Sequence, residues 1–172
     1  MGSLKMIAAC VLVAALGSQV FAVIACTPCR PPWVNFRSHC YLVWSEPKTF
    51  DEAEAHCQGL TVHGRPSHLA SIRSQEEQDF VSDLIAATVD QGQFIWFGYR
   101  RVDNTPRAFA WVDGCRLGDY TNWERGEPND TNEKCSILYD TGKWNDFFCS
   151  RNCVFVCKTP DRMSQTNCDG QK

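Results

Sequence analysis

The stretch between Trp123 and Cys149 holds the side chains of this 172-residue chain that are best suited to chemistry. Five of them carry oxygen atoms that could converge on one point: Glu127, Asn129, Glu133, Asn145 and Asp146. A set of carboxylates and amides, without nitrogen or sulfur ligands, is what a hard cation such as Ca²⁺ selects, with about six to eight oxygens around it. These residue types therefore predict a calcium site.

Two features around these side chains favour convergence. Cys135 and Cys149 flank the ligand-bearing segments, and if they pair, the disulfide ties both segments together before any metal binds. Pro128 stands between the first two ligands and indicates a rigid turn. A cis peptide bond before this proline would send the two neighbouring side chains to the same side.

The motifs, taken in order, resemble those of the C-type lectin-like domain. They are the Glu127-Pro128-Asn129 triplet, the Glu-x-Cys that begins at Glu133, the Trp144-Asn145-Asp146 triplet and the Trp-Phe-Gly of Trp96 to Gly98. The likeness extends over roughly Cys29 to Lys158. One triplet alone would be weak evidence, whereas the ordered set with its cysteine spacing is specific.

The resemblance implies an α+β C-type lectin-like fold, in which two helices flank small antiparallel sheets and a long calcium-binding loop. It also implies that the five oxygen-bearing residues bind both Ca²⁺ and a sugar. Each sugar hydroxyl on the metal still needs an acceptor for its proton and a donor for its other lone pair. Carboxylates accept and amide NH₂ groups donate, so Glu127 with Asn129, and Glu133 with Asn145, would supply both.

The order of the first triplet bears on the kind of sugar. In the family, Glu-Pro-Asn goes with equatorial 3- and 4-hydroxyls, as in mannose, glucose, N-acetylglucosamine and fucose-type diols, and Gln-Pro-Asp goes with galactose. An aromatic ring stacked on the apolar sugar face can override this rule. Trp111, Trp123 and Trp144 are the nearby candidates, although core packing is the commoner role for each.

Two departures from the family pattern matter. Only three residues separate Asn129 from Glu133, so the loop is tight and Glu133 could be displaced. Lys134 stands where members with a second calcium site carry an acid, which argues against a complete second site, although Asp130 could serve a partial one. The sequon Asn129-Asp130-Thr131 would place a glycan on a metal ligand, so we expect it to be unmodified.

The chain contains eleven cysteines, which in a short secreted protein indicates disulfides. The resemblance implies three pairs: Cys29–Cys40, Cys57–Cys157 and Cys135–Cys149. Cys115 and Cys153 are extra to that pattern, and we expect them to pair with each other. Cys26 and Cys168 lie near the two ends of the predicted mature chain, where both an intrachain bond and a disulfide-linked homodimer remain open.

Two capping boxes predict the helices that position these segments. Thr49 to Glu52 opens a helix that runs to about Gly59, and Ser74 to Glu77 opens a second. The second helix carries an apolar stripe, formed by Phe80, Val81, Leu84 and Ile85.

The strand pattern begins with a hairpin start between Cys29 and Cys40 and a short strand at 68–72, which follows a polar loop at 60–67. Five further strands are expected to form a small antiparallel sheet, at 94–99, 109–112, 136–139, 143–144 and 154–158. About 20 residues between Gly114 and Cys135 show little helix or strand pattern, and loops of that length are usually functional or disordered.

The chain ends bear on localisation. Lys5 and the apolar run from Met6 to Leu16 are typical of a secretory signal peptide and too short for a membrane span. We predict a signal peptide at 1–25, a lectin domain at 26–158, a polar tail at 159–172 and an extracellular protein. The formal net charge is −3 and no basic run occurs, so nucleic acid is not an expected partner.

The leading functional hypothesis is a secreted calcium-dependent lectin that binds glycans on cell or microbial surfaces, in agglutination or innate immune recognition. The alternative is a domain of the same fold that binds a protein ligand or a crystal surface such as ice or mineral. An enzyme is not expected, because the four histidines lie outside the candidate site and a metal-ligating glutamate is not free to shuttle protons.

Overall fold

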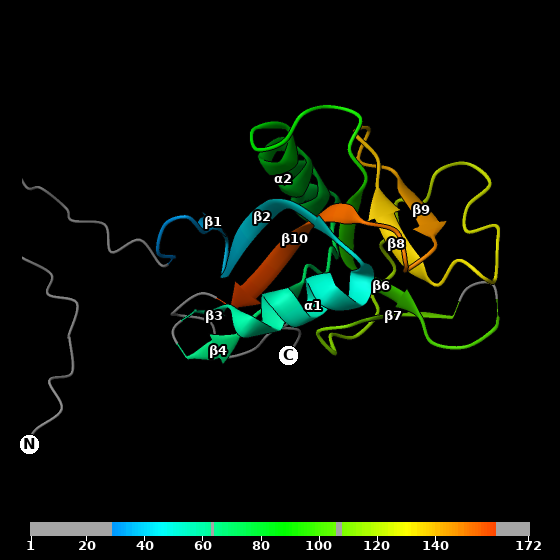
Figure 1. The fold of residues 1–172 in the computed structure, drawn as a ribbon, viewed down its shortest axis with the longest axis horizontal. Helices are drawn as coiled ribbons and strands as arrows, with labels where there is room; N and C mark the ends of the chain where they lie inside the picture. The colour runs from blue at the N-terminus through cyan, green and yellow to red at the C-terminus, as the bar shows by residue number, and fades with distance from the viewer. Residues whose placement is uncertain (1–28, 63, 106–107, 161–172) are drawn as a thin grey trace, which may run out of the picture.

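The computed structural model describes residues 29–62, 64–105 and 108–160, and it has an α+β architecture (Figure 1). The predicted signal peptide, Cys26 and Cys168 lie outside these residues. Helices α1 (Phe50–Gly59) and α2 (Gln75–Ala86) flank strands β2 (His39–Lys48) and β10 (Cys153–Pro160) in this view. None of the helices among the described residues is long and apolar enough to cross a membrane.

The strands form one large sheet and one small hairpin. They are β1 (Val34–Phe36), β2 (His39–Lys48), β3 (Thr61–Val62), β4 (Arg65–Pro66), β5 (His68–Leu69), β6 (Ile95–Arg101), β7 (Phe109–Trp111), β8 (Cys135–Leu138), β9 (Trp144–Phe147) and β10 (Cys153–Pro160). The large sheet runs β1-β2-β10-β6-β8-β9, with β5 on β10 and β7 on β6, while β3 pairs with β4. The predicted sheet was wholly antiparallel, but β10 and β6 pair in parallel, because β10 is inserted between β2 and β6.

The two helices cover two separate apolar cores. The core under α1 includes Phe50, Ala53 and Cys57, the buried residues of that helix. The core under α2 includes Val81 and Ile85 from the predicted stripe. Burial of these two helical faces, more than intrinsic propensity, is what holds short helices in place.

The N-terminus of α1 is capped as predicted. The backbone amide of Thr49 donates to the Glu52 carboxylate at 3.1 Å, and the Thr49 carbonyl accepts from the amide of Ala53 at 2.8 Å. Both bonds are local, so the motif could be read directly from the sequence.

The second capping box is only half formed. Ser74 accepts from the amide of Glu77 at 3.2 Å, but the Glu77 carboxylate does not return to the cap. It is buried and accepts from the Tyr41 hydroxyl, the Lys158 ammonium and the amide of Arg73. Glu77 therefore ties α2 to β2 and β10 through a buried ion pair that its sequence neighbours do not reveal.

Three expected disulfides are present, namely Cys29–Cys40, Cys57–Cys157 and Cys135–Cys149. The predicted Cys115–Cys153 bond is wrong. Cys153 is a free thiol with 4% of its surface exposed, and Cys115 is disulfide-bonded to a different cysteine. The physical reason is placement, since Cys153 belongs to the core under α1 and Cys115 to the core under α2.

Candidate functional site

Strand β9 carries two of the five predicted ligands. Its predicted extent was 143–144, but it continues to Phe147, so Asn145 and Asp146 lie on a strand and not in a loop. Asp146 pairs with Ser136 of β8 in the antiparallel register, and the Cys135–Cys149 disulfide closes the end of this hairpin. A hydrogen-bonded strand gives these two ligands a rigid base.

The middle of the long loop runs along the other edge of β9. The amide of Trp144 donates to the carbonyl of Asn122 at 2.9 Å, and the amide of Glu124 donates to the carbonyl of Trp144 at 2.8 Å. Trp123 and Trp144 form an isolated bridge between these segments. The segment that leads into the Glu-Pro-Asn triplet is therefore bonded directly to the strand that bears the other ligands.

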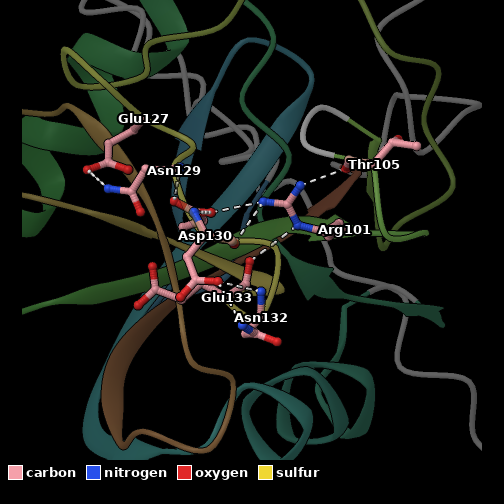
Figure 2. A network of polar contacts seen from close by, with 8 residues as sticks. Arg101, Thr105, Glu127, Asn129, Asp130, Asn132 and Glu133 are labelled. Atoms are coloured by element: carbon pink, nitrogen blue, oxygen red, sulfur yellow. Dashed lines mark hydrogen bonds and ion pairs between the residues drawn. The ribbon is translucent and has the colours of Figure 1, made fainter.

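Three of the predicted site residues are joined by hydrogen bonds. The Glu127–Pro128 peptide bond is cis, as anticipated, and Asn129 Nδ2 donates to Glu127 Oε1 at 2.9 Å. The backbone amide of Asn129 donates to Asp146 Oδ1 at 3.1 Å, so the triplet is docked on β9. Figure 2 shows the Glu127 and Asn129 side chains turned toward each other.

Two buried acceptor oxygens of the site have no hydrogen-bond partner. They are Oε2 of Glu127 and Oδ1 of Asn145, which has 9% of its surface exposed. Buried polar atoms are almost always paired, and an unpaired carboxylate oxygen costs free energy. A cation bound to both oxygens would remove that cost, which is the structural feature that fits calcium.

The carboxylates of the site make one another's ionised form less favourable. Burial raises the pKa of Glu127, and the nearby negative charges of Asp146 and Glu133 raise it further. Burial also raises the pKa of Glu133, to which repulsion from Asp146 and Asp130 adds. Negative charge is therefore held in a place where it is unfavourable unless a cation is present.

Across the described residues, no group of three or more His, Cys, Asp or Glu side chains is arranged to hold a metal ion. The candidate set includes three carboxylates, Glu127, Glu133 and Asp146, and the structure does not bring these three together as such a group. The donor chemistry of the five residues, all oxygen, fits Ca²⁺, which accepts both carboxylate and amide oxygens. Their role as metal ligands stays a prediction.

Arg101 is a residue of this region that no sequence motif revealed. It lies at the end of β6 with its side chain fully buried, and its guanidinium donates to Asp146 Oδ2 at 2.9 Å. It also donates to the carbonyls of Thr105 at 2.7 Å, Asp130 at 3.2 Å and Glu133 at 3.4 Å (Figure 2). A buried charge in a strand that reads as mostly apolar is the signal that could have drawn attention to it.

Only one of the three tryptophans considered for sugar stacking is available. Trp111 and Trp144 are buried in the core, and Trp144 Nε1 donates to Gln78. Trp123 is half-buried and lines a cavity of about 400 Å³ beside Glu127. The rest of the lining is Tyr99, Phe109, Thr121, Glu124 and Pro128. This cavity offers an aromatic wall next to the candidate calcium site.

Comparison with known proteins places these features in a family. The family model described as the lectin C-type domain matches residues 46–159. The alpha-N-acetylgalactosamine-specific lectin of Patiria pectinifera is 37% identical over 152 residues, which cover 83% of this chain and 84% of that protein. The low affinity immunoglobulin epsilon Fc receptor of Homo sapiens is 34% identical over 142 residues, 81% of this chain but only 40% of the receptor.

Solved structures agree with this placement. The C-type lectin CEL-I from Cucumaria echinata superposes with a TM-score of 0.70 at 27% identity, covering 76% of this chain and 96% of CEL-I. This superposition supports the C-type lectin fold for the arrangement of helices and strands described above.

Proposed function

Because this chain belongs to the C-type lectin domain family, we propose that it is a secreted, calcium-dependent lectin that binds glycans on cell or microbial surfaces. The observation that carries the proposal is the pair of unpartnered, buried oxygens on Glu127 and Asn145. They come from two segments that Asn129 already joins, and they are of the type that Ca²⁺ binds. The family is a lectin domain, and no enzymatic activity is proposed.

The protein would hold Ca²⁺ through five residues: Glu127, Asn129, Glu133, Asn145 and Asp146. When bound, the ion supplies a Lewis acid to which two vicinal sugar hydroxyls can coordinate. The chain provides the hydrogen bonds that orient them. Asn129 Nδ2 and Glu127 Oε1 already lie 2.9 Å apart, so a donor and an acceptor are adjacent where one hydroxyl would bind.

The sugar class that we propose is the mannose type, including glucose, N-acetylglucosamine and fucose-type diols. It rests on the order of acceptor and donor in the Glu127–Asn129 pair. The relative from Patiria pectinifera is named for α-N-acetylgalactosamine, so a galactose-type preference is the competing outcome. The aromatic side of the neighbouring cavity, mainly Trp123, could contact the apolar face of either sugar.

A glycan array probed with the purified protein in calcium and in EDTA tests this proposal. We expect binding to mannose-type glycans in calcium and loss of binding in EDTA. A Glu127→Ala, Asn145→Ala double variant serves as the matched control and should behave in calcium as the wild type does in EDTA. Binding that persists in EDTA, or in this variant, would contradict a calcium-dependent site at these residues.

One observation favours a second candidate function. Both carboxylate oxygens of Asp146 accept hydrogen bonds from the protein itself, from Arg101 and from the amides of Asn129 and Asp130. Part of the loop is therefore held by protein contacts alone, as a calcium-independent surface for a protein ligand or a crystal face such as ice or mineral would require. Binding that survives both EDTA and excess free mannose would identify this alternative.

Valency and export complete the proposal. A single shallow site gains little net free energy, because water competes for the metal and the hydrogen bonds, so several linked sites are needed for avidity. Because Cys115 is disulfide-bonded outside the three family pairs, at most one of Cys26 and Cys168 is left in a mature chain cleaved after residue 25, and we propose a disulfide-linked homodimer through that one cysteine, with a signal peptide at 1–25 and a tail at 159–172. Non-reducing electrophoresis of wild type, Cys26→Ser and Cys168→Ser, with N-terminal sequencing, tests both points. A monomer in every lane would refute the covalent dimer.

A further inference from the structure

We propose that Arg101 is a positioning residue that acts as a built-in cation, holding the calcium loop in its docked shape before any metal binds and taking the place of a second ion. The inference rests on the proposed function, since it concerns how the same loop reaches its binding-competent form. It assigns a role to a residue outside the five predicted ligands.

The contacts of Arg101 join three segments that are distant in the sequence. One guanidinium nitrogen donates to the Thr105 carbonyl, and the other donates to the Asp130 carbonyl and to Asp146 Oδ2. Nε points to the carbonyl of Glu133 at 3.4 Å, and the backbone amide of Arg101 donates to the carbonyl of Lys134 at 2.8 Å. Figure 2 shows the guanidinium between Thr105 on one side and the Asp130 to Glu133 segment on the other.

The chemistry of this cluster is that of a cation site. A carboxylate and three backbone carbonyls surround one positive group, and the side chains of both Arg101 and Asp146 are fully buried. The guanidinium also lies 4.5 Å from the centre of the Phe109 ring. Arginine suits this place because its charge is permanent and its flat group presents five donors in fixed directions.

The same contacts leave little for a second metal ion. Asp130 was the residue that could have served a partial second site. Its carbonyl accepts from Arg101, and its Oδ1 accepts from the amide and the side chain of Asn132 at 2.8 and 3.0 Å. Lys134 adds another positive charge nearby in the chain. We therefore expect one bound calcium ion per chain.

Arg101 has two opposing effects on calcium binding. It reduces the ordering that the ion would otherwise have to bring about, which favours binding. Its positive charge repels the ion, which disfavours binding. Replacing Arg101 by lysine keeps the charge but cannot reproduce the fork of donors, so this variant isolates the effect of ordering. In this variant the calcium ion would itself have to order about one more residue of the loop. That cost would weaken calcium binding by about tenfold, equivalent to about 1.4 kcal/mol.

Hydrogen exchange on the wild-type protein in EDTA tests the inference without a variant. The backbone amides of Asn129 and Asp130 both donate to Asp146, so they report on docking of the loop. We expect both to be protected in EDTA nearly as well as in calcium, and we expect titration calorimetry with CaCl₂ to give one site. Exchange at the rate of an unstructured peptide in EDTA, or two bound ions, would overturn the inference.

The variant Arg101→Lys and its neighbour Arg100→Lys form a matched pair. Arg100 is 41% exposed and pairs with Asp51 on the surface, so its replacement should change none of these readings. For Arg101→Lys we expect loss of loop protection in EDTA, recovery in saturating CaCl₂ and a calcium Kd about tenfold higher. If the melting temperature of Arg101→Lys falls by the same amount with and without calcium, and the calcium Kd is unchanged, the role of Arg101 is merely structural and the inference is overturned.

The two proposals fail in different ways. If the wild type binds no calcium, the proposed function fails, while protection of Asn129 and Asp130 in EDTA still decides whether Arg101 clamps the loop. If calcium and mannose bind but the loop is unprotected in EDTA, the proposed function holds and the role of Arg101 falls.

Discussion

Replacing Asp146 by asparagine separates the part that this carboxylate plays in holding the fold from its predicted part in binding calcium. Asp146 and Arg101 lie 2.9 Å apart, and both side chains have 0% of their surface exposed. Asparagine has nearly the same shape and keeps one acceptor oxygen, so the change removes mainly the negative charge. The guanidinium of Arg101 is then buried without a charged partner.

The size of the effect follows from that burial. Removing one partner of a buried ion pair costs about 3–5 kcal/mol, because the other charge is left uncompensated. Arg101 keeps the carbonyls of Thr105 and Asp130 as acceptors, so we expect a loss near the lower end, about 3 kcal/mol. For a domain of this size that corresponds to a fall in Tm of about 10 °C.

Glu133→Gln is the contrasting variant within the same site. Glu133 is half-buried, and its pKa is raised by burial and by repulsion from Asp146 and Asp130, so its charge opposes folding in the absence of calcium. Removing that charge should leave the calcium-free protein as stable as the wild type, or slightly more stable. Both variants should bind calcium more weakly, because each loses a predicted carboxylate ligand.

Urea denaturation in EDTA, with the disulfides intact, measures the free energy of unfolding of the three proteins. The slope of that free energy with urea should stay the same, so that a shift in midpoint reports stability. Equal losses in Asp146→Asn and Glu133→Gln, or no loss in Asp146→Asn, would refute the assignment of a buried ion pair that acts independently of calcium.

Three further predictions concern pH, specificity and the free thiol. The pKa values of Glu127 and Glu133 are raised above 4.5, so calcium affinity, measured by calorimetry, should begin to fall at a pH above that value; a constant affinity from pH 8 to 4.5 would contradict this. In EDTA the quantity that depends on pH is the free energy of unfolding, and its dependence has the opposite sign. The stability that Glu127 and Glu133 contribute at low pH, where they are protonated, is lost as pH rises through their raised pKa values. Glu127→Gln with Asn129→Asp exchanges donor and acceptor and should shift preference toward galactose-type glycans by about tenfold on an array; an unchanged ranking would mean that stacking sets specificity. Burial raises the pKa of Cys153 to about 12, so iodoacetamide at pH 8 should label its peptide only after denaturation, and labelling in the native state would contradict its burial.

Features with local causes could be predicted from the sequence. The helix at Phe50–Gly59 begins at a capping box whose two partners are three residues apart. The hydrogen bond between Glu127 and Asn129 spans two residues. Each of these depends on residues that a motif keeps together.

Features with distant causes could not be predicted in this way. The first residues of strand β2 are buried without a period of two, because both faces of the strand are covered: Tyr41 and Val43 belong to the core under α2, and Trp44 packs against the core under α1. Arg101 meets Asp146 across 45 residues, and Glu77 meets Lys158 across 81. Cys115 and Cys153 lie in different cores and therefore do not meet, and their spacing along the chain does not predict this.

Counting lone pairs shows which oxygens of the site remain for a metal. Asp146 Oδ2 accepts from both Arg101 and the amide of Asp130, so its two lone pairs are used. Asp146 Oδ1 accepts only from the amide of Asn129 and keeps one. Oε2 of Glu127 and Oδ1 of Asn145 keep both. The protein's own donors thus occupy the side of Asp146 that faces Arg101 and leave its other oxygen, with those of Glu127 and Asn145, in need of a cation. That division would allow Asp146 to belong to a permanent ion pair and still bind the predicted calcium ion.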